Sequence, residues 1–287
     1  MKRTPSPPPQ PPPDQPTFWN EDGGRRWVQN IDRVERMIEP LSARLLEFAA
    51  PRAGERVLDV GCGGGVTSAA LARAVGPEGR VLGVDVSAII LEVARRRFGP
   101  IGNLGFELGD AASMTLPAAR FDLLFSRFGV MFFADPVAAF THLRGALAPG
   151  GRLAFLCWRA LDQNPWMAGC VDAAFTVLPR PDPQPPGAPG PYAFADGVRL
   201  AGLLADAGFS GVRVDPLDTP LDLGPVDEAV VQMTRMGLAA SAYAAAAPEA
   251  QAAAEAAIRA VLERHVAPGG TVRMASATWL VGARAAI

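Results

Sequence analysis

The chain has 287 residues, of which 49% are hydrophobic and 20% charged, so it can bury the core of one large α/β domain with a lid, or of two small domains. Its net charge of −2 disfavours a general nucleic-acid binder, which normally has a basic excess. No run of about 18 apolar residues predicts a membrane span, and the proline-rich N-terminus is unlike a secretory signal. The three cysteines and two histidines lack metal-ligand spacing, so we expect no metal site and a reducing, cytoplasmic compartment.

The first 50 residues predict a tail followed by helices. Half of residues 1–16 are proline, which predicts a disordered or polyproline tail. Apolar residues then recur at spacings of three and four between residues 18 and 50, which predicts two helices broken near Pro40.

Residues 55–158 alternate between strand and helix patterns. Near-continuous apolar strands separated by helices are typical of a parallel sheet that is covered on both faces. Strands are expected at 56–60, 80–86, 104–108, 121–126 and 152–158, with helices at 67–75, 87–98 and 136–147. Ser87 is the expected N-cap of the second helix.

The C-terminal part predicts a long loop and two more strands. Seven prolines between residues 179 and 191 indicate the loop, and a helix follows at 196–207. Strands are expected at 212–223 and 271–283, with alanine-rich helices between them that are interrupted at Pro248. We therefore expect a tail at 1–16, a helical lid at 17–50, and a main domain at 51–287 with an insertion around 160–195.

A glycine cluster, Gly61 to Gly65, follows the first predicted strand. Doubly wound folds bind nucleotides at such a turn, because glycine lets a ligand lie against the backbone. The spacing does not fit the dinucleotide pattern, since Val66 occupies the place of the third glycine, and no phosphate-binding lysine follows.

Three carboxylates mark the ends of the first three strands. Asp59 precedes the glycines and suits a ligand that carries an ammonium group. Asp85 can accept hydrogen bonds from both hydroxyls of a ribose, and Asp110 from an adenine amino group. Ribose, adenine and an amino-acid end together describe S-adenosylmethionine better than NAD. Two simpler interpretations stay open, in which Asp85 only caps the helix beside Ser87 and Asp110 is only a turn residue.

The chain resembles the class I S-adenosylmethionine-dependent methyltransferases, in particular the branch with the ubiquinone and menaquinone C-methyltransferases. The resemblance covers about residues 18–160 and rests on five motifs in the right order. These are Asp59 to Gly65, Gly83-Val84-Asp85, Gly109-Asp110-Ala111, Phe121 to Leu124, and Leu143 to Leu153, in which Pro149-Gly150-Gly151 is expected to form a turn. It implies an α/β fold, a doubly wound and mostly parallel seven-stranded sheet with a reversed seventh strand and an N-terminal helical lid.

The resemblance also implies a cofactor site. The glycine loop lies under the methionine part, Asp85 holds the ribose, and Asp110 with Ala111 contacts adenine. The full set of expected cofactor contacts is Trp19, Asp59, Gly61, Cys62, Gly63, Asp85, Val86, Asp110, Ala111 and Ser126. Cys62 is expected to be a small filler and not a nucleophile, because no histidine lies nearby in sequence.

The acceptor side is less defined by the sequence. Arg127, Phe128 and Trp158 are candidate acceptor contacts, because the segment after the fourth strand faces the transferred methyl in this fold. Arg127 can either grip an acidic acceptor or form a salt bridge to the N-terminal helices. Trp19 and Trp27 either close over the cofactor or only anchor helices. His142 is expected on a surface away from the site.

The preferred function is therefore methyl transfer from S-adenosylmethionine to a small hydrophobic or aromatic acceptor, on oxygen, nitrogen or carbon. The alternatives are an NAD(P)-dependent oxidoreductase and a catalytically silent partner subunit that binds S-adenosylmethionine. We expect no nucleic-acid partner and a monomer or homodimer.

Overall fold

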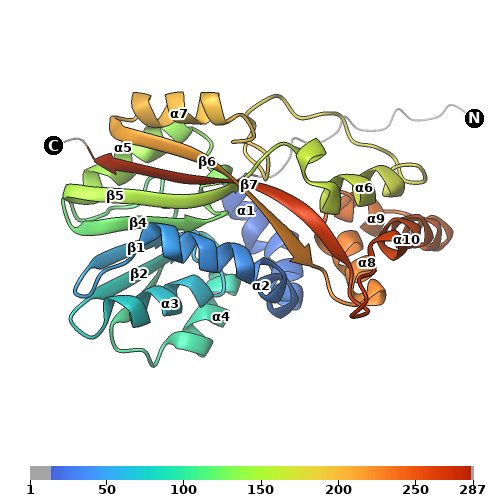
Figure 1. The fold of residues 1–287 in the computed structure, drawn as a ribbon, viewed down its shortest axis with the longest axis horizontal. Helices are drawn as coiled ribbons and strands as arrows, with labels where there is room; N and C mark the ends of the chain where they lie inside the picture. The colour runs from blue at the N-terminus through green and yellow to red at the C-terminus, as the bar shows by residue number, and fades with distance from the viewer. Residues whose placement is uncertain (1–13, 286–287) are drawn as a thin grey trace, which may run out of the picture.

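The computed structural model describes residues 14–285, which form a twisted sheet with helices on both faces and a helical cluster at one end (Figure 1). The sheet has seven strands in the order β3-β2-β1-β4-β5-β7-β6. Their bounds are β1 Arg56–Val60, β2 Arg80–Asp85, β3 Leu104–Leu108, β4 Phe121–Arg127, β5 Leu147–Trp158, β6 Phe209–Asp222 and β7 Arg273–Ala285. The first five strands pair in parallel, and β7 runs antiparallel to both β5 and β6. The predicted doubly wound fold with one reversed strand is confirmed.

The helices cover the sheet in two layers. Helices α2 (Asp22–Ala49), α3 (Val66–Val75) and α4 (Ala88–Phe98) lie on one side, and α5 (Pro136–Ala146) and α7 (Gly197–Asp206) lie on the other (Figure 1). The strands between these layers have buried side chains along nearly their whole length, as in β1 and β4. This explains why they read as continuous apolar runs rather than as alternating patterns.

A helical cluster extends beyond one end of the sheet. It consists of α6 (Pro165–Ala174), α8 (Val226–Met236), α9 (Ala240–Ala244) and α10 (Pro248–Leu262) (Figure 1). Helix α6 falls in the segment where only an insertion was expected. Pro248 starts α10, as predicted for an interruption, because proline at the first position of a helix loses no hydrogen bond.

The prediction of two N-terminal helices broken near Pro40 is wrong in its break point. Helix α1 (Gln15–Asn20) ends at Asn20, Glu21 separates the two helices, and α2 then continues for 28 residues through Pro40. Pro40 is exposed, whereas Ile38 and Leu41 beside it are buried. Burial of the inner face of α2 offsets the hydrogen bond that proline cannot make. Residues 1–13 of the expected tail lie outside the described residues, and Gln15 and Pro16 are helical.

The expected turn at Pro149-Gly150-Gly151 is part of β5. In the pairing of β4 with β5, Phe121 lies opposite Leu147 but Leu123 lies opposite Arg152, so β5 carries extra residues as a bulge. None of the helices between residues 14 and 285 has the length and apolar character needed to cross a bilayer.

Candidate functional site

A cavity of about 820 Å³ lies at the carboxyl ends of β1, β2, β3 and β4. Its lining falls into a polar and an apolar part. The polar part is made by residues after these strands, namely Gly61, Cys62, Gly63, Asp85, Val86, Gly109, Asp110 and Ala111. The apolar part includes Met37, Phe128, Met131, Phe132, Phe133, Trp158, Trp166, Met167, Met233 and Met236. Ligands of doubly wound folds bind at this edge of the sheet.

The glycine loop needs glycine for two different reasons. Gly61 has φ +66°, and a Cβ there would lie 2.7 Å from the Cα of Gly129, so the two loops can touch only without a side chain. Gly63 has φ +54°, and a Cβ there would meet only Trp27 Nε1, at 4.0 Å. Gly61 therefore serves close packing, whereas Gly63 leaves room for a ligand against the backbone.

Asp85 joins the glycine loop to the end of β2. Its Oδ2 accepts a hydrogen bond from the backbone N–H of Gly63 (2.8 Å) and its Oδ1 from that of Ser87 (2.9 Å). Desolvation by burial raises the pKa of Asp85. Ser87 caps α4 as predicted, since its hydroxyl accepts from Ile90 N–H. Because a carboxylate has about four acceptor positions, Asp85 can hold this loop and still accept from a ligand.

Asp110 and Ala111 lie at the end of β3, on the same cavity. Asp110 Oδ1 accepts from the N–H of Ala112 (2.9 Å), which starts a turn after the strand. Val86 also lines the cavity, next to Asp85. The structure thus brings together the expected contacts that follow β1, β2 and β3.

Asp59 and Ser126 lie behind the cavity and not in its lining. Asp59 is fully buried, and its Oδ2 accepts from the hydroxyls of Thr67 (2.8 Å) and Ser68 (2.6 Å). Desolvation raises the pKa of Asp59 to about 6, and its Oδ1 has no hydrogen-bond partner in the part of the chain that the structure describes. Ser126 donates to the carbonyl of Val60 (2.8 Å) and accepts from Gly129 N–H. The geometry therefore gives Ser126 a loop-holding position outside the cavity lining, and its expected contact with the cofactor stays a prediction.

The N-terminal helices reach over the glycine loop. Trp19 and Trp27 both line the cavity and meet edge to face, with ring centroids 5.9 Å apart. Trp19 Nε1 donates to Gln15, whereas Trp27 Nε1 is buried and has no partner among residues 14–285. Asn20, which lies in no motif, holds this segment in place: its amide donates to Val86 O and accepts from Ala88 N–H.

Arg127 forms the salt bridge that was the alternative to an acceptor contact. Its Nη1 lies 2.7 Å from Glu35 Oε2, its Nη2 donates to Glu35 Oε1, and Nη1 also donates to Ser42. Both side chains of the ion pair are more than nine-tenths buried. Arg127 lines the cavity, but Glu35 of α2 neutralises its charge, so it does not present a free cation to an acidic acceptor.

Phe128 and Trp158 form an aromatic wall of the cavity. The two rings are stacked, with centroids 4.3 Å apart and 8° between their planes. Phe128 has φ +63°, a left-handed conformation that costs free energy for a residue with a side chain. Such local strain is found where function requires a particular side-chain position.

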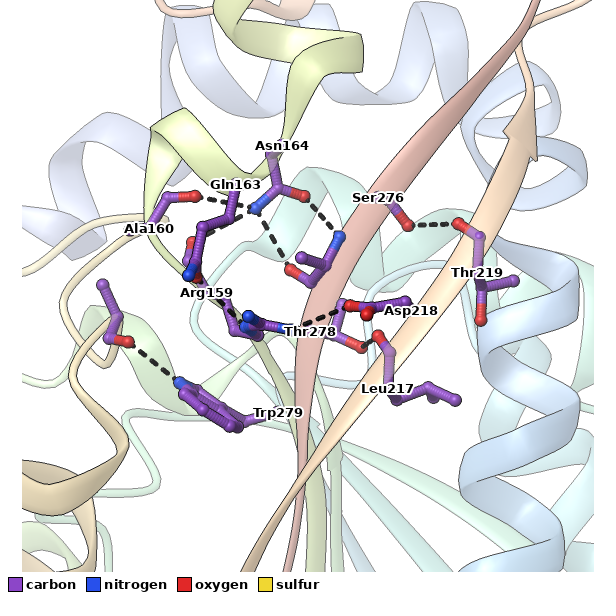
Figure 2. Close-up of polar contacts among 12 residues, drawn as sticks. Arg159, Ala160, Gln163, Asn164, Leu217, Asp218, Thr219, Ser276, Thr278 and Trp279 are labelled. Carbon is purple, nitrogen blue, oxygen red and sulfur yellow. Dashed lines mark hydrogen bonds and ion pairs between the residues drawn. The ribbon is translucent and has the colours of Figure 1, made fainter.

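Asn164 holds Trp166, whose ring lies next to that of Trp158 in the wall. It is fully buried, and its Oδ1 accepts from Trp166 Nε1 (3.1 Å). The same oxygen accepts from the N–H of Ala277 on β7 (2.9 Å) (Figure 2). Its Nδ2 donates to the carbonyls of Ala277 and Ala160. Arg159 turns away to Asp218 and Gln163, over the ring of Trp279. Neither Arg159 nor Asn164 lines the cavity, and Asn164 positions Trp166, which does.

The two remaining candidates, His142 and Cys62, are not arranged for catalysis in this cavity. His142 lies outside the lining, with Nε2 2.9 Å from the carbonyl of Met114. Cys62 lines the cavity, but burial raises its pKa well above the ordinary value, which agrees with a filler. Among the residues that the structure describes, no group of three His, Cys, Asp or Glu side chains is arranged to hold a metal ion.

Part of the lining could not be selected from the sequence. Gln232, Met233 and Met236 come from α8, and Tyr192 from the proline-rich loop. These residues lie in segments without a motif, and only the tertiary fold brings them to the glycine loop.

Comparison with known proteins identifies relatives of the chain. Residues 57–151 match a family described as a methyltransferase domain. Aklanonic acid methyltransferase DauC of Streptomyces sp. (strain C5) is 37% identical over 118 residues, which are 40% of this chain and 54% of the relative. Nocamycin O-methyltransferase of Saccharothrix syringae is 32% identical over 217 residues, 68% of this chain and 73% of the relative. The ubiquinone/menaquinone biosynthesis C-methyltransferase UbiE of Teredinibacter turnerae is 31% identical over 180 residues, 58% of this chain and 72% of the relative.

A solved structure shares the fold. Phosphoethanolamine N-methyltransferase 2 of Haemonchus contortus, in complex with phosphomonomethylethanolamine and S-adenosylhomocysteine, superposes with a TM-score of 0.58. The match is 15% identical in sequence and covers 94% of this chain and 59% of the other. This likeness concerns the fold.

Proposed function

The chain belongs to the class I S-adenosylmethionine-dependent methyltransferases of the UbiE-like branch, and on this premise we propose that it methylates a phenolic or enolic oxygen of a flat, apolar small molecule. One observation carries the proposal. A single cavity runs from the glycine loop at Gly61 and Gly63 to the aromatic wall at Phe128 and Trp158. Cofactor and acceptor would therefore share one enclosure.

The polar part of the cavity fits S-adenosylmethionine. We infer that Asp85 accepts from the ribose, that Asp110 and Ala111 contact the adenine, and that Gly63 lies against the methionine part. One buried polar atom of the cavity lining without a partner among residues 14–285, Trp27 Nε1, supports this assignment, because the carboxylate of an amino-acid end would accept its hydrogen bond. When bound, the cofactor supplies an electrophilic methyl group on a sulfonium.

The apolar part fits a flat ring system. The parallel pair of Phe128 and Trp158 offers a planar surface, and five methionines around it are Met37, Met131, Met167, Met233 and Met236. Methionine is flexible and adapts to irregular shapes, so this lining suits a bulky apolar molecule and tolerates variation in its substituents.

Two observations support oxygen as the methylated atom. The match to the nocamycin O-methyltransferase is 217 residues long and covers 68% of this chain, against 180 residues and 58% for the C-methyltransferase UbiE of Teredinibacter turnerae, and both extend beyond the family domain at 57–151. The buried carboxylate of Glu35 is paired with Arg127, which leaves a neutral environment that favours neither an ammonium nor a carboxylate acceptor.

We assign two contributions to the protein. It aligns the acceptor with the methyl group, and it excludes water from the cavity. In a displacement at a sulfonium methyl, most of the acceleration comes from holding the nucleophile in line. We propose that residues 17–50 act as the lid, with Trp19 and Trp27 over the glycine loop, and that residues 51–287 form the transferase domain. The acceptor-facing insertion around 160–195 then includes Trp166 and the proline-rich loop, next to Trp158 at the end of β5.

A coupled assay for S-adenosylhomocysteine release tests this function. Matched acceptors with one ring system and different nucleophiles are 1-naphthol, 1-naphthylamine and 1-naphthoic acid. We expect release with the naphthol and not with the amine or the acid. Asp85→Asn is the control that should suppress release with every acceptor. Turnover of the amine in preference to the naphthol would overturn the assignment.

A further inference from the structure

Gln232 brings an amide into the apolar part of the cavity. The residue lies on α8, is 2% exposed and lines the cavity between Met233, Met236 and Met37. Its Nε2 contacts Met37 Sδ at 2.8 Å, whereas its Oε1 is buried without a hydrogen-bond partner in the described part of the chain.

The orientation of this amide follows from the chemistry of its neighbour. A thioether sulfur can accept a hydrogen bond but cannot donate one. The nitrogen of Gln232 therefore faces Met37, and the oxygen faces away from it. The amide oxygen of Gln232 is therefore the atom without a partner, and it is a hydrogen-bond acceptor.

Gln232 differs from the carboxylates of the lining, which are hydrogen-bonded or ion-paired, and from Trp27, whose unpartnered lining atom is a donor and not an acceptor. Glu35 is paired with Arg127, Asp85 accepts from Gly63 and Ser87, and Asp110 accepts from Ala112. A buried acceptor without a partner costs free energy that a methionine at the same place would not cost. A ligand that donates a hydrogen bond removes this cost.

We propose that Gln232 is a specificity-determining residue whose amide oxygen accepts a hydrogen bond from a hydroxyl of the methyl acceptor, other than the one that is methylated. This inference rests on the proposed function. An uncharged donor is required, because Gln232 is neutral and Met37, Met233 and Met236 beside it bring no charge. A site that pairs with a substrate hydroxyl rejects the analogue that lacks it, since the protein atom is then left unpaired.

A binding experiment with matched ligands tests the proposal without requiring turnover. The probes are 1-naphthol and the isomeric dihydroxynaphthalenes, titrated into the full-length enzyme loaded with S-adenosylhomocysteine, with quenching of tryptophan fluorescence as the signal. The wild type should bind at least one diol about tenfold or more tightly than 1-naphthol. Gln232→Met should bind both equally. Thr234→Val is the control on the same helix, because the Thr234 hydroxyl bonds within α8 and lies outside the cavity lining.

The melting temperature separates recognition from a structural role. Gln232→Met should raise it by roughly 2–4 °C, because an unpaired buried oxygen is removed. A lower melting temperature together with an unchanged preference for the diol would show that Gln232 only supports the fold, and a wild type without any preference would also overturn the proposal. If the diols bind with the expected preference but release no S-adenosylhomocysteine, the proposed methylation fails while the role of Gln232 stands.

Discussion

Phe128 and Trp158 lie parallel at a centroid distance of 4.3 Å, although the backbone of Phe128 has the left-handed φ of +63°. Phe128 comes directly after β4 and Trp158 ends β5, so two neighbouring strands each deliver one ring. The stacking and burial of the two rings offset the backbone strain and fix a flat wall beside the glycine loop.

Replacement of Phe128 separates acceptor binding from cofactor binding. Phe128→Gly relieves the left-handed backbone but removes half of the wall. We expect kcat/KM for the acceptor to fall about tenfold to a hundredfold, since an aromatic contact and its buried area are lost. The affinity for S-adenosylhomocysteine, measured by calorimetry, should stay unchanged. Phe128→Tyr keeps the ring and is the control, and an equal loss of acceptor turnover in both variants would contradict this role.

Trp27 is predicted to bind the carboxylate of the cofactor. A hydrogen bond to a charged group contributes about 1.5–3 kcal/mol, so Trp27→Phe should weaken S-adenosylhomocysteine roughly tenfold to a hundredfold in calorimetric titration. Binding of 5′-methylthioadenosine, which lacks the amino-acid end, should not change. Trp19→Phe is the matched control, because the Trp19 indole already donates to Gln15. Equal weakening of both ligands by Trp27→Phe would assign the ring a packing role only.

Asp59 should make the fold less stable as the pH rises. Its pKa lies near 6 in the folded protein and near 3.8 in the unfolded chain, so the folded state holds the extra proton between these values. The stability that protonated Asp59 contributes is present below pH 4 and lost by pH 6, and amounts to about 3 kcal/mol. Asp85, whose pKa is also raised, acts in the same direction.

Urea denaturation between pH 4 and pH 7 checks the sign. Asp59→Asn should gain stability relative to the wild type as the pH rises, and the difference should disappear near pH 4. If the free energy of unfolding changes with pH in the same way for both proteins, ionisation of Asp59 does not destabilise the folded state, and the prediction is wrong.

The Glu35–Arg127 pair is predicted to be structural. Glu35→Gln leaves a buried guanidinium without its counter-charge, so the free energy of unfolding should fall by about 3–5 kcal/mol. Replacing both residues by methionine should restore most of the stability, as followed by urea denaturation. The exposed pair of Arg44 and Glu47 is the control, and Glu47→Gln should cost less than about 1 kcal/mol. If Glu35→Gln unfolds like the wild type and binds 1-naphthoic acid, Arg127 is an acceptor contact after all.

The lid should respond to cofactor only in its first part. Leu41 and Leu45 in the second half of α2 are fully buried, so their backbone should exchange slowly with or without ligand. Residues 17–30 carry Trp19, Asn20 and Trp27, and their hydrogen exchange should slow when S-adenosylhomocysteine is added. Slow and unchanged exchange across residues 17–30 would make both tryptophans static packing.

Local patterns were sufficient to predict the strands and the polar half of the cavity. The strands at 56–60 and 104–108 have the predicted bounds. The first is buried along nearly its whole length, as a continuous apolar run predicts, whereas the second is an edge strand that is mostly exposed. Gly61, Gly63, Asp85 and Asp110 directly follow or end such strands, so sequence position alone brought them to one edge of the sheet.

Features that depend on distant segments could not be predicted. The sequence left open a salt bridge from Arg127 to the N-terminal helices but did not single out Glu35, which lies 92 positions away. Nothing in it indicated the contact of Gln232 with Met37, which are 195 positions apart. Neither partner lies in a motif. Pro40 shows the same limit, because the local rule for proline was overridden by burial of the inner face of α2.

Methyl transfer to a hydroxyl oxygen in this cavity is tested most directly by following an isotopically labelled methyl carbon. The enzyme is incubated with labelled S-adenosylmethionine and a hydroxyaromatic acceptor, and the product is examined by NMR. The label should appear as a methoxy carbon, and its appearance should depend on Asp85. A label found on nitrogen, or on no acceptor although S-adenosylhomocysteine binds, would contradict the account.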